Sequence, residues 1–210
     1  MTLNLTLTGA QFERLDLPDA ELIWYPHPGL ERRPEEWFGL LERSLAWREE
    51  SIELFGKRYR QPRLLAWYGD TGASYRYSGV VHQPLPWLPE LERLRRRVEH
   101  LTGARFNSVL ANLYRHERDS MGLHADDEPE LGPRPVIASL SFGHTRIFRL
   151  RHRRRRELKP VRLPLTSGSL LVMRGDTQRH WKHEVPKQRS PCGPRINLTF
   201  RWVEPAMRRA

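Results

Sequence analysis

Apolar residues recur at helical spacing in two stretches of the chain. The first stripe starts after Pro34 and consists of Trp37, Phe38, Leu41, Leu45 and Ala46. The second stripe consists of Leu91, Leu94, Val98 and Leu101, and Gly103 follows it at the position of a C-terminal cap. Because a spacing of three and four residues places side chains on one helical face, we predict helices from Pro34 and over about 89–102.

Short apolar segments separated by turn residues dominate the rest of the chain. Residues 51–69 read as a strand, a turn at Gly56 and a second strand. Further strands are predicted at 105–114, 136–143, 146–152, 161–165, 168–174, 180–185 and 194–203, whereas residues 1–33 look irregular. Many short strands after a helix indicate a mainly β protein of the α+β class, closed or two-sheeted, with helices packed outside.

The charge of the chain favours a polyanionic partner. Its 210 residues include 36 Lys and Arg against 25 Asp and Glu, a formal net charge of +11. The densest run is Arg151-His152-Arg153-Arg154-Arg155-Arg156, between two predicted strands and therefore at the tip of a hairpin. Nucleic acid is the leading candidate partner, although a basic surface also serves plain solubility.

Composition excludes several classes of protein. A single cysteine, Cys192, forms neither an internal disulfide nor a cysteine zinc cluster. No apolar run approaches the roughly 20 residues that span a membrane, and the first residues do not resemble a secretory signal. We therefore expect an intracellular protein that does not enter the membrane. Its length suits one domain.

The last predicted strand alternates apolar and polar residues. Ile196, Leu198, Phe200 and Trp202 point one way, into apolar packing. The other face carries Arg195, Asn197, Thr199 and Arg201. Two arginines with an amide and a hydroxyl make an anion-binding wall; the alternative is an exposed polar sheet face.

Two histidines and an aspartate have the character of a metal site. His124 and Asp126 project from one side of an extended segment, and an imidazole with a carboxylate suits Fe(II). His183 is the candidate third ligand. His180 falls on the opposite strand face, so only one of these two histidines points inward. The alternatives are a chance His-x-Asp occurrence and a surface His183.

These segments, in this order, resemble the AlkB family of Fe(II)/2-oxoglutarate-dependent nucleic-acid demethylases. The similarity runs from about Gln61 to Val203. Its segments are Gln61-Pro62-Arg63, Phe106-Asn107-Ser108, Asn112-Leu113-Tyr114, His124-Ala125-Asp126-Asp127-Glu128, Ile137 to Gly143 and Arg195 to Arg201. The resemblance implies a double-stranded β-helix, or jelly roll, with N-terminal helices outside and a substrate-lid hairpin. It implies one catalytic domain over 1–210, with a recognition lid within 1–80 and the core within 81–210.

The resemblance also implies cofactors and their ligands. Fe(II) would be bound by His124, Asp126 and His183. The cosubstrate 2-oxoglutarate would be held by Asn112, Tyr114, Arg195, Asn197, Thr199 and Arg201, and O₂ would react at the metal. Arg195 and Tyr114 would pair with the distal carboxylate, and Arg201 would lie near the end that chelates iron.

A base has to leave the stack to be modified, so a site for a flipped base is expected. By resemblance, Tyr77 and Tyr75 would stack on it, and Asp127 and Glu128 would bind its amino group. Ser78, Arg63 and a wedge residue, Phe55, complete the predicted substrate set. Phosphates would be bound by Arg151, Arg153, Arg154, Arg155 and Arg156. The alternatives are strand packing for the tyrosines, a core position for Phe55, and solvated turns for the acids and the arginines.

The resemblance predicts repair of 1-methyladenine and 3-methylcytosine in single- or double-stranded DNA, with release of formaldehyde and succinate. Such an enzyme would be monomeric and cytoplasmic, and nucleoid-associated if bacterial. The alternatives are an RNA or tRNA demethylase, an oxygenase acting on a protein or another non-nucleic-acid substrate, and a non-catalytic nucleic-acid-binding module.

Overall fold

Two sheets form the body of the protein. A computed structural model describes residues 4–7, 10–54, 56–73, 75–77 and 80–204. The larger sheet contains nine strands, in the order β1 (Asn4–Leu7), β2 (Ala10–Leu17), β3 (Ala20–Tyr25), β13 (Leu170–Arg174), β10 (Ile137–Gly143), β15 (Arg195–Arg201), β8 (Ser108–Tyr114), β5 (Lys57–Gly69) and β4 (Arg48–Leu54). The smaller contains β12 (Val161–Leu165), β11 (Arg146–His152), β14 (Trp181–Val185) and β9 (Met121–His124).

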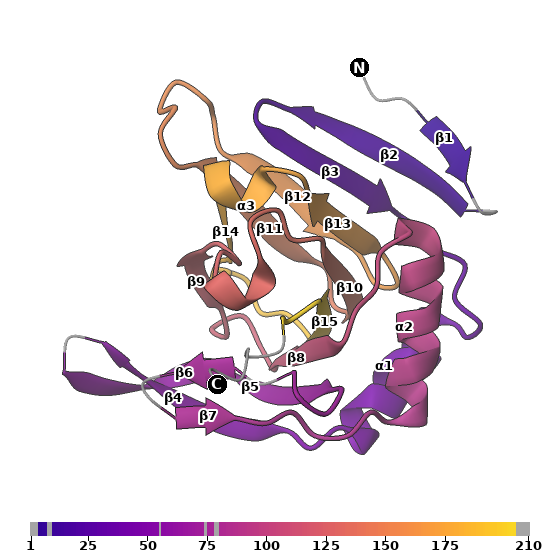
Figure 1. Cartoon of the computed structure of the whole chain (residues 1–210), viewed down its shortest axis with the longest axis vertical. Helices are drawn as coiled ribbons and strands as arrows, with labels where there is room; N and C mark the ends of the chain where they lie inside the picture. The colour runs from indigo at the N-terminus through magenta and orange to yellow at the C-terminus, as the bar shows by residue number, and fades with distance from the viewer. Residues whose placement is uncertain (1–3, 8–9, 55, 74, 78–79, 205–210) are drawn as a thin grey trace, which may run out of the picture.

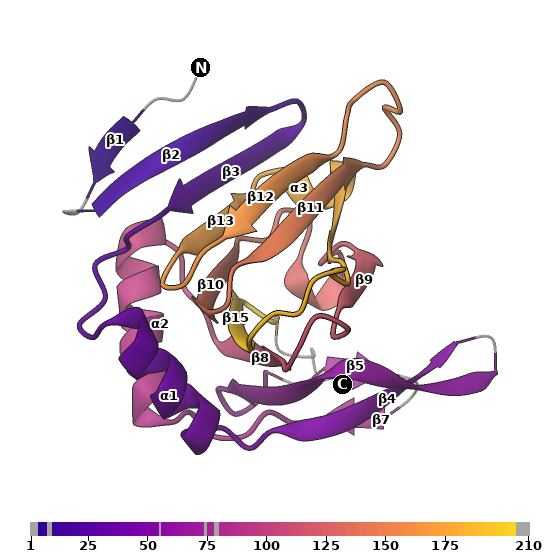
Figure 2. The ribbon, with the colours of Figure 1, turned by 180° about the vertical axis from the view of Figure 1, so that it is seen from behind.

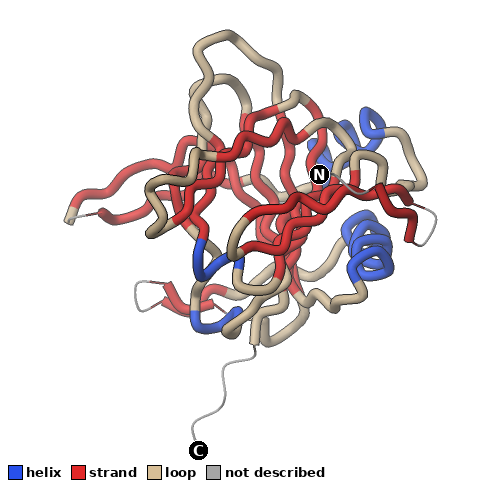
Figure 3. The backbone as a smooth tube through the Cα atoms, turned by 90° about the horizontal axis from the view of Figure 1, so that it is seen from above, coloured by secondary structure: helices blue, strands red, loops and turns tan. Residues whose placement is uncertain are grey.

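The shorter elements complete the architecture. Strands β6 (Tyr75–Tyr77) and β7 (Val80–His82) pair by themselves beside β5. The helices are α1 (Pro34–Ser44), α2 (Pro89–Thr102) and α3 (Thr177–His180), with a 3₁₀ turn, η1, at Pro129–Leu131. Strands are the main regular element of the chain (Figure 3). The described helices include none long and apolar enough to span a membrane.

The central strands of the larger sheet are covered on both faces. Helices α1 and α2 lie side by side against one face (Figures 1 and 2). The core on that side includes Trp37, Leu41, Leu94, Leu140, Ile196, Leu198 and Phe200. The smaller sheet covers the other face, and the core between the sheets includes Ile137, Phe148, Leu150, Leu171, Met173 and Trp181. This is a jelly-roll core with helices outside, so the predicted fold class is confirmed.

Most predicted elements are confirmed within a few residues. Helix α2 has the predicted bounds, and α1 begins at Pro34 with Glu35 and Glu36 in its first turn. The arginine run forms the end of β11 and the loop to β12, which pairs antiparallel with β11. The hairpin prediction is therefore confirmed, and this loop projects from the smaller sheet (Figure 1).

Two sequence predictions were wrong, and one strand was missed. The segment within residues 1–33 is not irregular throughout, because β1, β2 and β3 extend the larger sheet and β3 pairs with the distant β13. Strand β9 was not predicted as a strand. Trp202 is 46% exposed, because β15 ends at Arg201 and its alternation does not extend further.

Candidate active site

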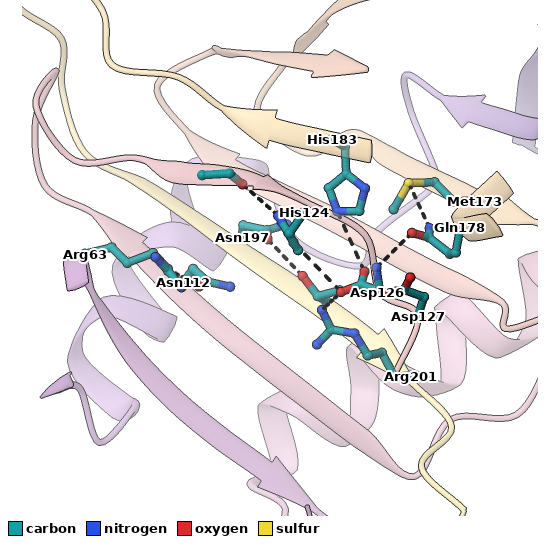
Figure 4. Close-up of polar contacts among 12 residues, drawn as sticks. Arg63, Asn112, His124, Asp126, Asp127, Met173, Gln178, His183, Asn197 and Arg201 are labelled. Atoms are coloured by element: carbon teal, nitrogen blue, oxygen red, sulfur yellow. Dashed lines mark hydrogen bonds and ion pairs between the residues drawn. The ribbon is translucent and has the colours of Figure 1, made fainter. Parts of the chain in front are cut away.

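Three candidate metal ligands meet between the two sheets. His124 ends β9, Asp126 follows two residues later, and His183 lies on β14 directly opposite His124 in the strand register. The Asp126 carboxylate faces both rings (Figure 4), with Oδ1 3.9 Å from His124 Nε2 and Oδ2 3.8 Å from His183 Nε2. All three ligand atoms lie within 4.8 Å of one another.

The ligands are oriented by their neighbours. The Nδ1 atom of His124 lies 2.8 Å from the carbonyl oxygen of Gly122, which places a proton there and leaves the Nε2 lone pair free. The backbone N–H of Asp126 donates to Gln178 Oε1 at 3.0 Å. His183 packs on Phe148, with ring centroids 5.1 Å apart. The cluster is thus held in place before any metal binds.

The protonation states suit metal binding. Burial lowers the pKa of His183 to about 3, so its ring is neutral at pH 7. Burial raises the pKa of Asp126, but Arg201, which donates to Oδ1 at 2.6 Å, and the rings of His183 and His124 together hold the pKa below its usual value. Oδ2 of Asp126 is buried with no hydrogen-bond partner among the described residues. Two neutral imidazoles and one carboxylate with an unused oxygen fit a divalent iron centre.

A small cavity of about 40 Å³ lies beside these ligands, along the strands of the larger sheet. The predicted cosubstrate residues Asn112, Tyr114, Arg195, Asn197, Thr199 and Arg201 all line it. Their convergence follows from the strand register, in which Arg195 lies opposite Tyr114 and Asn197 opposite Asn112. The alternating face of β15 is therefore a cavity wall and not an exposed polar face.

Arg195 is a buried cation with unused donors. Its side chain is 1% exposed, and Nη2 donates to Ser141 Oγ at 2.9 Å. Its Nε and Nη1 atoms have no partner among the described residues. Burial lowers its pKa to about 10, which still leaves it charged at neutral pH. A buried, half-unpaired guanidinium fits the planar carboxylate of a dicarboxylic acid.

The side-chain amides of the cavity wall are each held by hydrogen bonds to neighbouring side chains. Asn197 Nδ2 donates to Ser139 Oγ at 2.8 Å, and Thr199 Oγ1 donates to Asn197 Oδ1 at 3.0 Å. Arg63 Nε donates to Asn112 Oδ1 at 2.8 Å. Arg63 is itself buried and reaches the cavity through Asn112, so its predicted contact with substrate stays a prediction.

The other predicted substrate residues do not line the cavity or lie outside the described residues. Asp127 is exposed and accepts a hydrogen bond from Arg153 of the arginine run (Figure 4 labels Asp127). Glu128 directly precedes η1, and burial raises its pKa. Phe55 and Ser78, and the side chains of Tyr75 and Tyr77, lie outside the described residues. The predicted roles of these residues remain predictions.

The sequence prediction missed several residues that position the site. Gln178 bonds the Asp126 backbone and donates to Met173 Sδ at 3.5 Å. Arg146 is 1% exposed, and its guanidinium donates to the backbone carbonyls of His116, Asp119 and Pro186. The Cζ atoms of Arg146 and Arg195 lie 5.6 and 5.3 Å from the centroid of the Tyr114 ring. Arg146 therefore ties together the loops that flank β9 and β14.

Replacing Arg146 by methionine is expected to lower the free energy of unfolding by about 3 kcal/mol, because three carbonyls lose a charged donor inside the protein. Urea unfolding of the metal-free protein measures this. The matched control is Arg151→Met on the exposed side of the same strand, with an expected change below about 0.5 kcal/mol. Equal losses in the two variants would contradict the role assigned to Arg146.

A second cluster, Asp19, His152 and His180, also brings three metal-ligand side chains together. Nδ1 of His152 accepts the backbone N–H groups of Arg154 and Arg155, at 3.2 and 2.9 Å. The proton of the ring is therefore on Nε2, which faces Asp19 Oδ2 at 3.2 Å. Since that nitrogen donates, it does not ligate a metal, and the cluster anchors the arginine run to the β2–β3 turn.

Comparison with known proteins agrees with this geometry. The family described as the 2OG-Fe(II) oxygenase superfamily matches residues 22–201. An oxidoreductase of the 2OG-Fe(II) oxygenase family from Burkholderia pseudomallei shares the fold, with a TM-score of 0.58, 16% identity, and coverage of 90% of this chain and 89% of that one. Fold and site together define the class of this protein as the 2OG-Fe(II) oxygenases.

Sequence relatives narrow the class. The alpha-ketoglutarate-dependent dioxygenase alkB homolog 3 of Bos taurus is 46% identical over 181 residues, which cover 82% of this chain and 63% of that protein. The human DNA oxidative demethylase ALKBH2 is 44% identical over 180 residues, covering 83% of this chain and 66% of that protein. The chain spans less than two thirds of the length of these two relatives. It belongs to the AlkB family, which confirms the resemblance seen in the sequence.

Proposed function

We propose that this protein is a single-domain enzyme that repairs N-alkylated bases in DNA, of the 1-methyladenine and 3-methylcytosine type. The observation that carries the proposal is the joint cavity, in which a buried carboxylate with an unused oxygen and a buried arginine with unused donors face one space. A metal and a dicarboxylate together satisfy both groups. With Fe(II), 2-oxoglutarate and O₂ bound, the centre supplies oxidation of the N-methyl group, with formaldehyde, succinate and CO₂ as products.

The chain's own residues bind and orient these partners. His124, Asp126 and His183 would hold the metal on the smaller-sheet side of the cavity. Arg195 would pair with the distal carboxylate of 2-oxoglutarate, and the Asn112–Asn197 pair would line its path. Arg201 keeps Asp126 ionised and fixes its orientation. The buried walls exclude water, which strengthens these charge interactions.

The assignment of DNA as the substrate is supported by the sequence relatives and by the positive charge of the surface. One relative, human ALKBH2, is a DNA oxidative demethylase. The arginine run is exposed on the surface, as a phosphate-binding segment has to be. We further propose that the protein acts as a monomer in the cytoplasm, on the nucleoid if it is bacterial, and that Tyr75 and Tyr77 stack on the flipped base. Asp127 and Glu128 would bind the amino group of that base.

The test uses matched oligonucleotides that carry 1-methyladenine, as single-stranded DNA, as duplex DNA and as RNA. Repaired base is quantified with Fe(II) and 2-oxoglutarate present, and with each left out. We expect repair of DNA that depends on both. Repair of RNA alone would replace the DNA assignment with an RNA demethylase, and consumption of 2-oxoglutarate with no repair of any form would contradict a methylated base as the substrate.

The Phe55 wedge is tested by Phe55→Ala. An apolar wedge between base steps assists unstacking of a duplex, so repair of duplex DNA is expected to fall about tenfold while single-strand repair changes less than about twofold. Initial rates on the two substrates measure the difference. Equal losses of repair on the two substrates would contradict a wedge role for Phe55.

A further inference from the structure

The outer face of the smaller sheet carries a group of cations on the reverse of the strand that bears His183. Side chains alternate across a strand, so Lys182 points away from the cavity into which His183 points. Arg149 and Arg151 alternate with the buried Phe148 and Leu150 of β11 in the same way. The reverse face is defined here by four residues on three neighbouring strands: Arg149, Arg151, Arg162 and Lys182.

The strand register sets like charges directly opposite one another on this face. Arg149 lies opposite Arg162 across β11 and β12, and Arg151 lies opposite Lys182 across β11 and β14. Directly opposite like charges destabilise a sheet. Arg149 is also opposite Glu184, which offsets its charge, so the repulsion that remains is between Arg151 and Lys182, and an anion lying across these two would relieve it.

An acidic neighbour neutralises one of the four cations of the reverse face. Glu184 lies opposite Arg149 and pairs with it, since Nε of Arg149 donates to Oε1 at 2.6 Å. Within the described part of the chain, Arg151, Arg162 and Lys182 form no ion pair within 4.0 Å. Three cations on neighbouring strands thus stay without an acidic partner among the described residues.

The reverse face is continuous with the arginine run. Arg151 is followed directly by the loop that contains Arg153 to Arg156, and this loop leads into β12, which carries Arg162. Arg153 and Arg155 are engaged by Asp127, Asp19 and Glu157. The cations without an acidic partner therefore extend from the loop onto the outer face of the smaller sheet, on the side opposite to the cavity.

We propose that the reverse face binds the phosphodiester backbone of the nucleic-acid substrate, at nucleotides several positions away from the base in the cavity. Arginine forks match phosphate oxygens, and charge neutralisation releases counterions from the strand. The cavity and the reverse face lie on opposite sides of β14, so one short oligonucleotide does not occupy both. The proposal rests on nucleic acid being the substrate, and it makes affinity depend on the length of the strand.

The test compares two triple variants on DNA of about 5 and about 30 nucleotides carrying 1-methyladenine. The test variant combines Arg151→Gln, Arg162→Gln and Lys182→Gln. The control variant removes the same charge from exposed arginines beside the helices, with Arg43→Gln, Arg96→Gln and Arg105→Gln. Fluorescence anisotropy gives Kd over a range of salt concentrations, and thermal unfolding verifies that both variants are folded.

For the long strand, the test variant is expected to bind about tenfold more weakly at physiological salt. The slope of log Kd against log salt should fall by about 2, because each of the three lost phosphate contacts contributes roughly 0.7 to it. Its affinity for the short strand should change less than about twofold, and its melting temperature should not fall, because like-charge repulsion is removed. A salt slope equal to that of the wild type, or an equal weakening in the control variant, would overturn the proposal. Because binding is measured without turnover, a failure of the demethylase assignment alone leaves the length-dependent binding in place.

Discussion

Replacing Asp126 by alanine is expected to reduce the rate of base repair about 1,000-fold or more. Asp126 is the only carboxylate among the three candidate ligands, and its loss also leaves the charge of Arg201 without its partner. Loss of an outer-shell partner already costs about 10- to 100-fold in metal affinity or activity, so loss of a direct ligand costs more. Formaldehyde release measures the rate, and calorimetric titration with a divalent metal measures binding.

The neighbouring carboxylate offers a matched control. Asp127 is one residue further along, but its side chain is 52% exposed and pairs with Arg153 outside the metal cluster. Asp127→Ala is expected to leave metal affinity within about twofold of the wild type, whatever its effect on substrate. Wild-type metal affinity in the Asp126→Ala variant would contradict the ligand assignment.

Replacing Arg195 by methionine is expected to raise the KM for 2-oxoglutarate about 100-fold. Removing one partner of a buried charge pair costs about 2–5 kcal/mol, and Arg195 is the buried guanidinium whose free donors face the cavity. The metal ligands lie at the other end of the site, so metal affinity should not change. The measurement is the 2-oxoglutarate dependence of repair, with KM and kcat determined separately.

Two conservative variants refine this result. Arg195→Lys retains the charge without the planar fork, so its KM should lie between those of the wild type and Arg195→Met. Ser141→Ala removes the acceptor that orients Nη2 of Arg195 and should raise KM by about tenfold or less. An unchanged KM in Arg195→Met would show that the dicarboxylate binds elsewhere.

The cavity wall could be predicted from the sequence because alternation along one strand is a local property. Arg195, Asn197 and Thr199 face the cavity, as their positions between Ile196, Leu198 and Phe200 indicate. Trp202 departs from the pattern, because the end of a strand is set by its pairing partners and not by its own sequence.

The rest of the site depends on contacts that sequence patterns do not contain. Gln178 reaches Asp126 from a helix 52 positions away, and a glutamine in a short helical turn carries no signal of such a role. Arg146 reads as one more surface cation in an arginine-rich chain, yet it is buried among backbone carbonyls. Strands β2 and β3 were missed because Arg14 interrupts the apolar alternation of β2, and because β3 is completed by its pairing with β13.

The most direct test of the account is the stoichiometry of one reaction. Purified wild-type protein is given Fe(II), 2-oxoglutarate, air and single-stranded DNA that carries 1-methyladenine, and repaired base, formaldehyde and succinate are counted together. The account predicts equal amounts of all three products, none of them formed by Asp126→Ala. Succinate that forms at the same rate with unmethylated DNA, with no repaired base, would contradict it.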